Sequence, residues 1–243
     1  MIDCRAATKS YDSQPVLRGI DLVVEPGMCA LLGANGAGKS TLLRLLSGLE
    51  EPDSGSVFIG GRGFGDNGVE IRRSLGVLPE GLGLFESLSI IENLMAIGPI
   101  YGLTRRETEE RATNLLELLD LTRRRRTIAR DCSFGMRKKT ALAMALLHKP
   151  RFLLLDEPFE GVDPASCSVI EMLLGQLSSN GTTILFTSHI LPIVQKIATR
   201  VVILHQGRVE SDFNPSIAKE GVEEVYFGVV GEPKREVGDW LRA

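Results

Sequence analysis

The segment Gly33–Ser40 constrains the fold of this chain more than any other part of the sequence. It reads Gly-Ala-Asn-Gly-Ala-Gly-Lys-Ser, which fits the phosphate-binding pattern G-x-x-x-x-G-K-[ST]. The apolar run Met28–Leu32 before it is typical of a buried strand, and Lys39–Ser47 after it reads as a helix that ends at Gly48. Because a strand, a glycine loop and a helix occur in that order, the sequence predicts a phosphate-binding loop within an α/β domain.

The predicted loop would bind a nucleotide polyphosphate through its backbone. Glycines let the chain wrap closely around the phosphates, so that successive N–H groups and the helix N-terminus face their negative charge. Lys39 would add a positive charge at the outer phosphates, and Ser40 would supply a hydroxyl ligand to Mg²⁺. The candidate nucleotide-binding residues of this segment are Gly33, Ala34, Asn35, Gly36, Ala37, Gly38, Lys39, Ser40 and Thr41.

Two carboxylates follow a second apolar strand, Phe152–Leu155, without a break. Ligands of α/β folds bind at the carboxyl ends of the strands, where Asp156 and Glu157 would lie. Asp156 would hold Mg²⁺ directly or through water, and Glu157 would orient or deprotonate the attacking water. His189 follows the strand-like run Thr182–Thr187 and would donate a hydrogen bond to a γ-phosphate oxygen. Acids at a strand end are also common on solvated surfaces, and it is the phosphate loop that favours the catalytic interpretation.

The rest of the pattern predicts one α/β unit with an inserted helical subdomain. Strands and helices alternate as expected for a P-loop NTPase core with a mainly parallel sheet and an N-terminal antiparallel β portion. Between about Leu88 and Leu121 the apolar positions have a helical period, and no strong strand pattern interrupts them. We therefore expect one nucleotide-binding domain over residues 1–211, a helical subdomain over about 85–148, and a short tail over 212–243.

Two further segments carry weaker patterns. Gly63–Gly68 matches the dinucleotide-binding fingerprint G-x-G-x-x-G after a short strand. The spacing of a βαβ unit around it is poor, so we expect a flexible loop there rather than a nucleotide site. In the tail, we expect a strand at Val225–Val230.

Composition and charge argue against several classes of protein. The longest apolar run, Ala141–Leu147, has seven residues, whereas a membrane-spanning helix needs about 20. The net charge of -3 gives no broad attraction to nucleic acid, and the basic run Arg123–Arg126 reads as a solvated surface. The four cysteines form no CxxC pair, which disfavours a zinc ribbon or a disulfide framework. The first residues lack the pattern of a signal peptide, so we expect a cytoplasmic protein. From the net charge, we expect no binding of nucleic acid.

The order of these motifs resembles an ATP-binding cassette (ABC) transporter subunit, and the similarity spans about Ile2–Glu210. Tyr11 falls where the family places an aromatic ring that stacks on adenine. Gly76–Glu80 falls where the family has a loop ending in a glutamine that reaches Mg²⁺ and touches the membrane partner. Glu80 replaces that glutamine, and a carboxylate can still accept a hydrogen bond from metal-bound water. The resemblance thus adds Glu80 to Ser40 and Asp156 as a candidate metal-site residue.

Two more resemblances concern a second copy of the cassette. The segment Cys132–Met136 aligns with the family's LSGGQ signature and keeps Ser133 and Gly135, with Ser133 well suited to cap the following helix. Gly161–Asp163 resembles the family's loop that crosses the interface between two cassettes. In the family, the signature closes over ATP bound to the opposite subunit, which gives a two-fold dimer. The resemblance therefore implies that Ser133, Gly135 and Asp163 contact nucleotide.

As a whole, the resemblance implies an ATPase, with ATP and Mg²⁺ as cofactors, that energises transport through a separate membrane-spanning subunit. The loop ending in Glu80, the altered signature and the short tail favour an exporter, since importer cassettes often carry a longer extension. The resemblance further implies that the subunit lies at the cytoplasmic face of the membrane and pairs with a second cassette, which is either identical or different. The alternative is a soluble cassette ATPase acting on ribosomes or nucleic acid, although such proteins commonly join two cassettes or carry a long coiled coil. The intact catalytic residues argue against a purely regulatory module.

Overall fold

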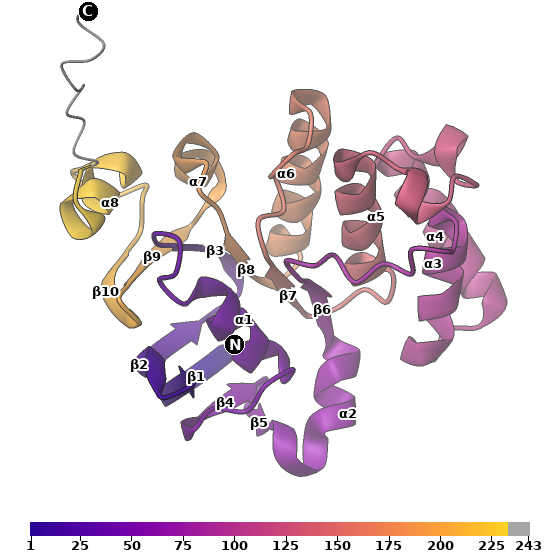
Figure 1. The fold of residues 1–243 in the computed structure, drawn as a ribbon. Coiled ribbons are helices and arrows are strands. Elements are labelled where there is room, and N and C mark those ends of the chain that lie inside the picture. The colour runs from indigo at the N-terminus through magenta and orange to yellow at the C-terminus, as the bar shows by residue number, and fades with distance from the viewer. Residues whose placement is uncertain (233–243) are drawn as a thin grey trace, which may run out of the picture.

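The computed structural model describes residues 1–232, apart from the side chain of Asp66, and arranges them as two sheets surrounded by helices (Figure 1). The strands are β1 (Ile2–Tyr11), β2 (Gln14–Val24), β3 (Gly27–Leu32), β4 (Ser54–Ile59), β5 (Arg62–Gly63), β6 (Leu75–Leu78), β7 (Phe152–Leu155), β8 (Thr183–Thr187), β9 (Arg200–His205) and β10 (Arg208–Phe213). The helices are α1 (Lys39–Ser47), α2 (Phe64–Ser74), α3 (Ile90–Ile97), α4 (Arg105–Leu118), α5 (Phe134–Leu146), α6 (Pro164–Ser179), α7 (Leu191–Ile197) and α8 (Val222–Val230). Three 3₁₀ turns are η1 (Gly98–Tyr101), η2 (Thr122–Arg124) and η3 (Ala129–Asp131).

The larger sheet has six strands in the order β10-β9-β3-β8-β7-β6. The pairs from β9 to β6 are parallel, and β10 at the edge runs antiparallel to β9. Every residue of β7 and β8 is buried, as expected for parallel strands that are covered on both faces. The predicted mainly parallel sheet of an α/β core is thus confirmed.

The smaller sheet has the order β2-β1-β4-β5 and is antiparallel throughout. Its first hairpin turns at Asp12 and Ser13, which both adopt positive φ angles. This sheet is the predicted N-terminal antiparallel portion. Figure 1 shows it with α1 on one side of the larger sheet, while α6 and α7 lie on the other side.

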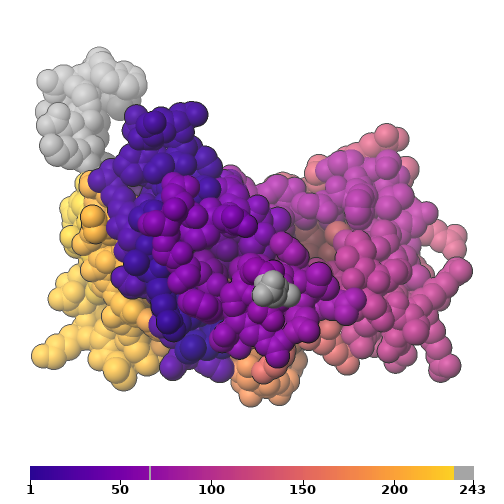
Figure 2. All heavy atoms as spheres, turned by 90° about the horizontal axis from the view of Figure 1, so that it is seen from below, coloured from indigo at the N-terminus to yellow at the C-terminus, as the bar shows by residue number. Residues whose placement is uncertain are grey.

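Helices α3, α4 and α5 gather at one side of the molecule, away from the C-terminal elements (Figure 2). Their sequences define their starts, because Ser89 with Glu92 and Thr104 with Glu107 form capping boxes at α3 and α4. These helices fall within the expected insertion over residues 85–148. The division into domains itself stays a prediction.

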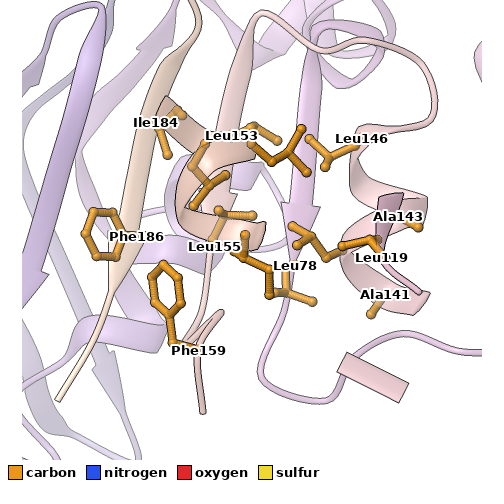
Figure 3. Packing of buried hydrophobic residues seen from close by; sticks show 14 of the residues in the cluster. Leu78, Leu119, Ala141, Ala143, Leu146, Leu153, Leu155, Phe159, Ile184 and Phe186 are labelled. Atoms are coloured by element: carbon orange, nitrogen blue, oxygen red, sulfur yellow. The ribbon is translucent and has the colours of Figure 1, made fainter. Parts of the chain in front are cut away.

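One hydrophobic core joins the helices to the larger sheet. Figure 3 shows Leu153 and Leu155 of β7 among side chains from β6, β8 and the helices, including Ala141 of α5. The alternate residues of β7, Phe152 and Leu154, belong to a second core beneath the sheet, together with α1 and the antiparallel strands. The short strand β7 therefore packs into both halves of the molecule.

The segment predicted as a flexible loop, Gly63–Gly68, is instead the start of a helix. Helix α2 begins at Phe64, directly after the strand residue Gly63. The ring of Phe64 packs so closely on Gly48 that a Cβ at that glycine would lie 2.3 Å from Phe64 Cε1. Ile71 in the last turn is buried. These tertiary contacts override the low helix propensity of the glycines, so the predicted loop was wrong.

The strand predicted at Val225–Val230 is also wrong, because these residues lie in helix α8. The partly buried side chains Val225, Tyr226, Val229 and Val230 pack against the main core. Their spacing has the period of an α-helix, which outweighs the strand propensity of the β-branched residues. The rest of the expected tail, residues 233–243, lies outside the described residues. Within the described part of the chain, no helix is both long enough and apolar enough to span a bilayer.

Candidate nucleotide-binding and hydrolysis site

The phosphate-loop segment connects the end of β3 to the start of α1. Gly38 is the N-cap of α1 and has a φ of 108°, a left-handed conformation that glycine adopts without strain. A Cβ at this position would also lie 2.8 Å from Cδ2 of Leu17. Among residues 1–232 no side chain caps α1, so the N–H groups of its first turn can face an anion.

Lys39 lies directly over this loop. Its ammonium donates hydrogen bonds to the carbonyl oxygens of Gly33 at 2.7 Å and Ala34 at 3.2 Å. Burial lowers the pKa of Lys39, while the nearby carboxylates of Glu157 and Asp156 act in the opposite direction. The loop lysine and the two strand-end acids therefore belong to one electrostatic site.

Thr187, the last residue of β8, fixes the two acids at the end of β7. Its hydroxyl donates to the carboxylate of Asp156 at 2.6 Å and accepts from the backbone N–H of Glu157 at 2.8 Å. Glu157 has a φ of 47°, an uncommon conformation for a residue other than glycine. Thr187 was not among the predicted site residues, although its place at the strand end just before Ser188 and His189 is a usable signal.

His189 lies beside the carboxylate of Glu157. Its Nδ1 is 3.0 Å from Glu157 Oε2, and its backbone N–H donates to the same oxygen at 3.2 Å. Burial raises the pKa of Glu157, whereas the contacts with His189 and the charge of Lys39 act to lower it. The structure thus brings together Glu157 and His189, and the contact of His189 with a phosphate stays a prediction.

The three candidate metal-site residues border one small space. A cavity of about 30 Å³ is lined by Ser40, Glu80 and Asp156, and Glu80 Oε2 lies 3.8 Å from a guanidinium nitrogen of Arg44. One hydroxyl and two carboxylates form an oxygen-only donor set, which suits Mg²⁺. Over residues 1–232 no group of three or more His, Cys, Asp or Glu side chains could hold a metal alone. The residues present fit an ion that takes most of its ligands from phosphates and water.

Tyr11 lies at the end of β1, where it pairs with Gln14 across the hairpin. Its hydroxyl donates to the carboxylate of Glu50, and its side chain is partly open to solvent. The same hairpin reaches the phosphate loop, because a Cβ at Gly38 would lie 3.2 Å from the carbonyl oxygen of Val16. The hairpin that carries Tyr11 thus lies beside the phosphate loop at Val16, and the stacking of Tyr11 on adenine stays a prediction.

The two segments expected at a dimer interface lie together within one chain. Ser133 caps α5 by accepting from the N–H of Met136 at 3.3 Å, and Asp163 caps α6 by accepting from the N–H of Ser166 at 3.0 Å. A Cβ at Gly135 would lie 2.9 Å from the carbonyl oxygen of Gly161. The predicted nucleotide contacts of Ser133, Gly135 and Asp163 stay predictions.

Replacing Thr187 with Val removes the hydroxyl that bridges Asp156 and Glu157 while keeping the shape of the side chain. We expect kcat for ATP hydrolysis to fall about 10- to 100-fold, because mispositioning of reacting groups costs that much. Steady-state hydrolysis assays measure the effect. Thr183→Val, at the other end of the same strand, is the matched control. A kcat within twofold of the unaltered chain for Thr187→Val would contradict a role for the bridge.

Comparisons with known proteins agree with this geometry. The family model described as "ABC transporter" matches residues 17–160. The linearmycin resistance ATP-binding protein LnrL of Bacillus subtilis (strain 168) is 36% identical over 210 residues, which cover 86% of this chain and 68% of that protein. The Nod factor export ATP-binding protein I of Cupriavidus metallidurans is 36% identical over 216 residues, which cover 88% of this chain and 71% of that protein.

A solved structure shows the same fold. The dimeric ATP-binding cassette MJ0796 in a post-hydrolysis state, bound to ADP and Pi, has a TM-score of 0.82 and 25% identity, over 88% of this chain and 98% of that one. ABC ATP-binding subunits hydrolyse ATP, form dimers and work with membrane subunits. The family match, the two relatives and the site of β3, β7 and β8 agree, and the chain belongs to the ABC transporter family as an ATP-binding, ATP-hydrolysing cassette.

Proposed function

We propose that this ATPase energises export across a membrane through a separate membrane-spanning subunit. The observation that carries the ATPase part is the geometry at the end of β7, where Thr187 holds Asp156 and Glu157 and where Asp156 lines one cavity with Ser40 of the phosphate loop. The charge of Lys39 acts on both carboxylates from the same loop. Phosphoryl transfer depends mainly on positioning and on stabilising charge, and these groups supply both.

Each site residue has a proposed role that follows from its place. The backbone of Gly33–Gly38 and the first turn of α1 bind the phosphates of ATP, and Lys39 turns from the loop carbonyls to the outer phosphates. Glu157 orients the attacking water or takes its proton, and a raised pKa suits a proton acceptor. His189 holds the Glu157 carboxylate on one side and can donate a hydrogen bond to a γ-phosphate oxygen.

Mg²⁺ would be held by Ser40 and Asp156, with Glu80 reaching its water ligands. The ion supplies neutralisation of phosphate charge when it is bound. The carboxylate of Asp156 is oriented for this by its hydrogen bond from Thr187.

A second cassette would complete each nucleotide site. Ser133 opens α5 and lies at its positive N-terminus, a suitable position for facing a phosphate of ATP bound to the partner. Gly135 has no side chain that would collide with the carbonyl oxygen of Gly161, so the two segments can lie close together. Asp163 follows Gly161 in the loop proposed to cross the interface. The two cassettes would close around ATP and separate after hydrolysis.

The membrane subunit would dock beside the loop that ends in Glu80. A cavity of about 290 Å³ is lined by Pro79 of that loop, by Leu82 just after it, and by side chains of α3, η1 and α5. Most of its lining is apolar, and Leu49 at its edge is 66% exposed. An apolar cavity between the sheet and the helices suits the apolar anchor of a partner segment.

The direction of transport is proposed from the relatives and from the sequence. One relative is named for Nod factor export and another for linearmycin resistance. The altered signature Cys132–Met136 and the loop ending in Glu80 favour the same direction. We place the chain at the cytoplasmic face of the membrane, where ATP is available.

Copurification from the native host tests the membrane partner. Leu49→Glu adds a charge at the edge of the proposed docking cavity, and Val69→Glu is the matched control because Val69 is 64% exposed and lies outside that cavity. We expect the tagged unaltered chain and Val69→Glu to recover a multi-spanning membrane protein, and Leu49→Glu to recover much less. ATP affinity is measured for each variant, so that a failure of the nucleotide site is recognised. Recovery of ribosomes or nucleic acid, without a membrane protein, would favour the soluble ATPase.

A further inference from the structure

Lys138 is a buried lysine that the roles above leave unexplained. It lies in the second turn of α5, and only 2% of its side chain is exposed. A buried ammonium destabilises a protein unless nearby groups compensate its charge. An apolar residue of similar length would fill the same space without that cost, so the contacts of this ammonium indicate what it does.

Within the described residues, the carboxylate in ion-pair contact with Lys138 is that of Glu160, three residues after the catalytic Glu157. Lys138 Nζ is 3.8 Å from Glu160 Oε2, a charge contact rather than a direct hydrogen bond. Nζ also lies 5.3 Å from the ring centroid of Phe134, within the range of a cation–π interaction. One ammonium thus contacts the signature segment and the loop that follows Glu157.

Phe134 makes a second contact between these two segments. Its ring lies against the backbone of Gly161, where a Cβ would be only 2.3 Å from Phe134 Cδ1. The family signature has glycine at the position of Phe134, so this aromatic contact is a property of this chain. The ring therefore has Gly161 and the ammonium of Lys138 as neighbours.

The loop that Lys138 contacts is firmly connected to Glu157. The N–H of Glu160 donates to the carbonyl oxygen of Glu157 at 3.2 Å, which makes a tight turn. Within that turn, Phe159 is buried and packs edge-on against Phe186 of β8. A displacement of Glu160 would therefore shift the backbone of Glu157.

The charges around Lys138 agree with this placement. Burial lowers the pKa of Lys138, and the carboxylates of Glu160, Glu157, Asp156 and Glu80 all act to raise it. All four carboxylates belong to the hydrolysis site or to the loops beside it. Lys138 thus adds a positive charge from α5 beside the site, in addition to that of Lys39.

We propose that Lys138 is a positioning residue for ATP hydrolysis, which holds the loop carrying Glu157 against the signature helix through Glu160 and Phe134. The proposal rests on the proposed function of Glu157. Lys138 acts on turnover and leaves the binding of ATP to the phosphate loop unchanged. It connects the segment expected to sense the partner's nucleotide with the carboxylate expected to activate water.

Lys138→Met, Lys138→Arg and Glu160→Gln test this proposal, with Lys149→Met as the control at an exposed lysine just after α5. We expect Lys138→Met to lower kcat about 10- to 100-fold, the effect of mispositioning a catalytic group, with KM and ATP affinity within twofold. Lys138→Arg keeps the charge and should recover most of the activity. Glu160→Gln should lower kcat in the same direction, and the double variant Lys138→Met/Glu160→Gln should be no slower than the slower single variant.

Thermal unfolding separates positioning from simple stabilisation. A methionine in place of a buried ammonium should leave the melting temperature equal or higher, since Glu160 is half exposed and can be solvated. Unchanged kcat in Lys138→Met, or a rise in KM alone, would overturn the proposal. If Lys138→Met does not fold, Glu160→Gln decides, and an unchanged kcat there overturns the proposal equally.

Glu157→Gln is measured in parallel, so that a failure of the proposal for Lys138 can be distinguished from a failure of the proposed function of Glu157. Loss of turnover in Glu157→Gln with normal turnover in Lys138→Met overturns only the role of Lys138. Normal turnover in Glu157→Gln overturns the proposed function of that residue itself.

Discussion

Glu157→Gln should bind ATP with unchanged affinity and hydrolyse it about 10²- to 10⁴-fold more slowly, the contribution typical of a general base. Glutamine has the shape of glutamate, and its amide oxygen can still accept the hydrogen bond from the N–H of His189. The amide cannot take a proton from water, and it carries no charge to orient one. The loss should therefore appear in kcat, with little change in the equilibrium binding of ATP.

Two measurements check this prediction. Single-turnover hydrolysis gives the rate of the chemical step, and calorimetric titration gives the affinity for ATP. Glu210→Gln, on an exposed position of β10, is the matched control and should behave as the unaltered chain. Since ATP would close two cassettes and hydrolysis would separate them, Glu157→Gln with ATP should also elute as a stable dimer. Turnover above half of the normal rate would rule out Glu157 as the residue that activates water.

Lys39→Met should have the opposite effect and lower the affinity for ATP about 100-fold, since hydrogen bonds to charged groups contribute about 1.5–3 kcal/mol. The ammonium of Lys39 already makes two hydrogen bonds to carbonyl oxygens of the loop, and these can be exchanged for phosphate oxygens. Methionine keeps most of the length of the side chain and removes the charge. The affinities for ATP and ADP should both fall, because both nucleotides carry the β-phosphate.

Titration with ATP and ADP measures this effect, and Lys219→Met at an exposed position is the control. Circular dichroism establishes that the variant is folded, so that weak binding reports on the site. An affinity for ATP within threefold of the unaltered chain would show that Lys39 does not contact the phosphates. Together, Lys39→Met and Glu157→Gln separate binding from hydrolysis at a single site.

Local sequence patterns predicted the parts of the fold that depend on local interactions. Helix α1 has the predicted bounds, Lys39–Ser47, because a glycine loop precedes it and Gly48 ends it. The strand Phe152–Leu155 was also predicted correctly, since a short apolar run before two acids fits a buried strand. Helix α2 and helix α8 were missed because in both cases tertiary packing or period outweighed residue propensity.

The motifs of the candidate site could be predicted from the sequence, whereas the contacts between these motifs and distant elements could not. Asp156 and Glu157 are neighbours in sequence at a strand end, so their joint position followed from the pattern. Thr187 reaches them from the adjacent strand, and that contact depends on the order of strands in the sheet. Lys138 reaches Glu160 from a helix that no local pattern places beside the loop. Contacts between elements distant in sequence depend on the topology of the fold, and local patterns in a single sequence do not reveal that topology.

The alternation of β7 between two cores has a consequence for how sequence changes far from ATP can alter catalysis. Leu153 and Leu155 are held by the helices, and Phe152 and Leu154 by α1 and the antiparallel strands. Both cores therefore hold β7 in place, and the acids Asp156 and Glu157 follow at its carboxyl end. Weaker packing in either core would let the carboxyl end of β7 move more. Substitutions in opposite halves of the molecule should therefore lower the rate of hydrolysis in the same way, without any contact with the nucleotide.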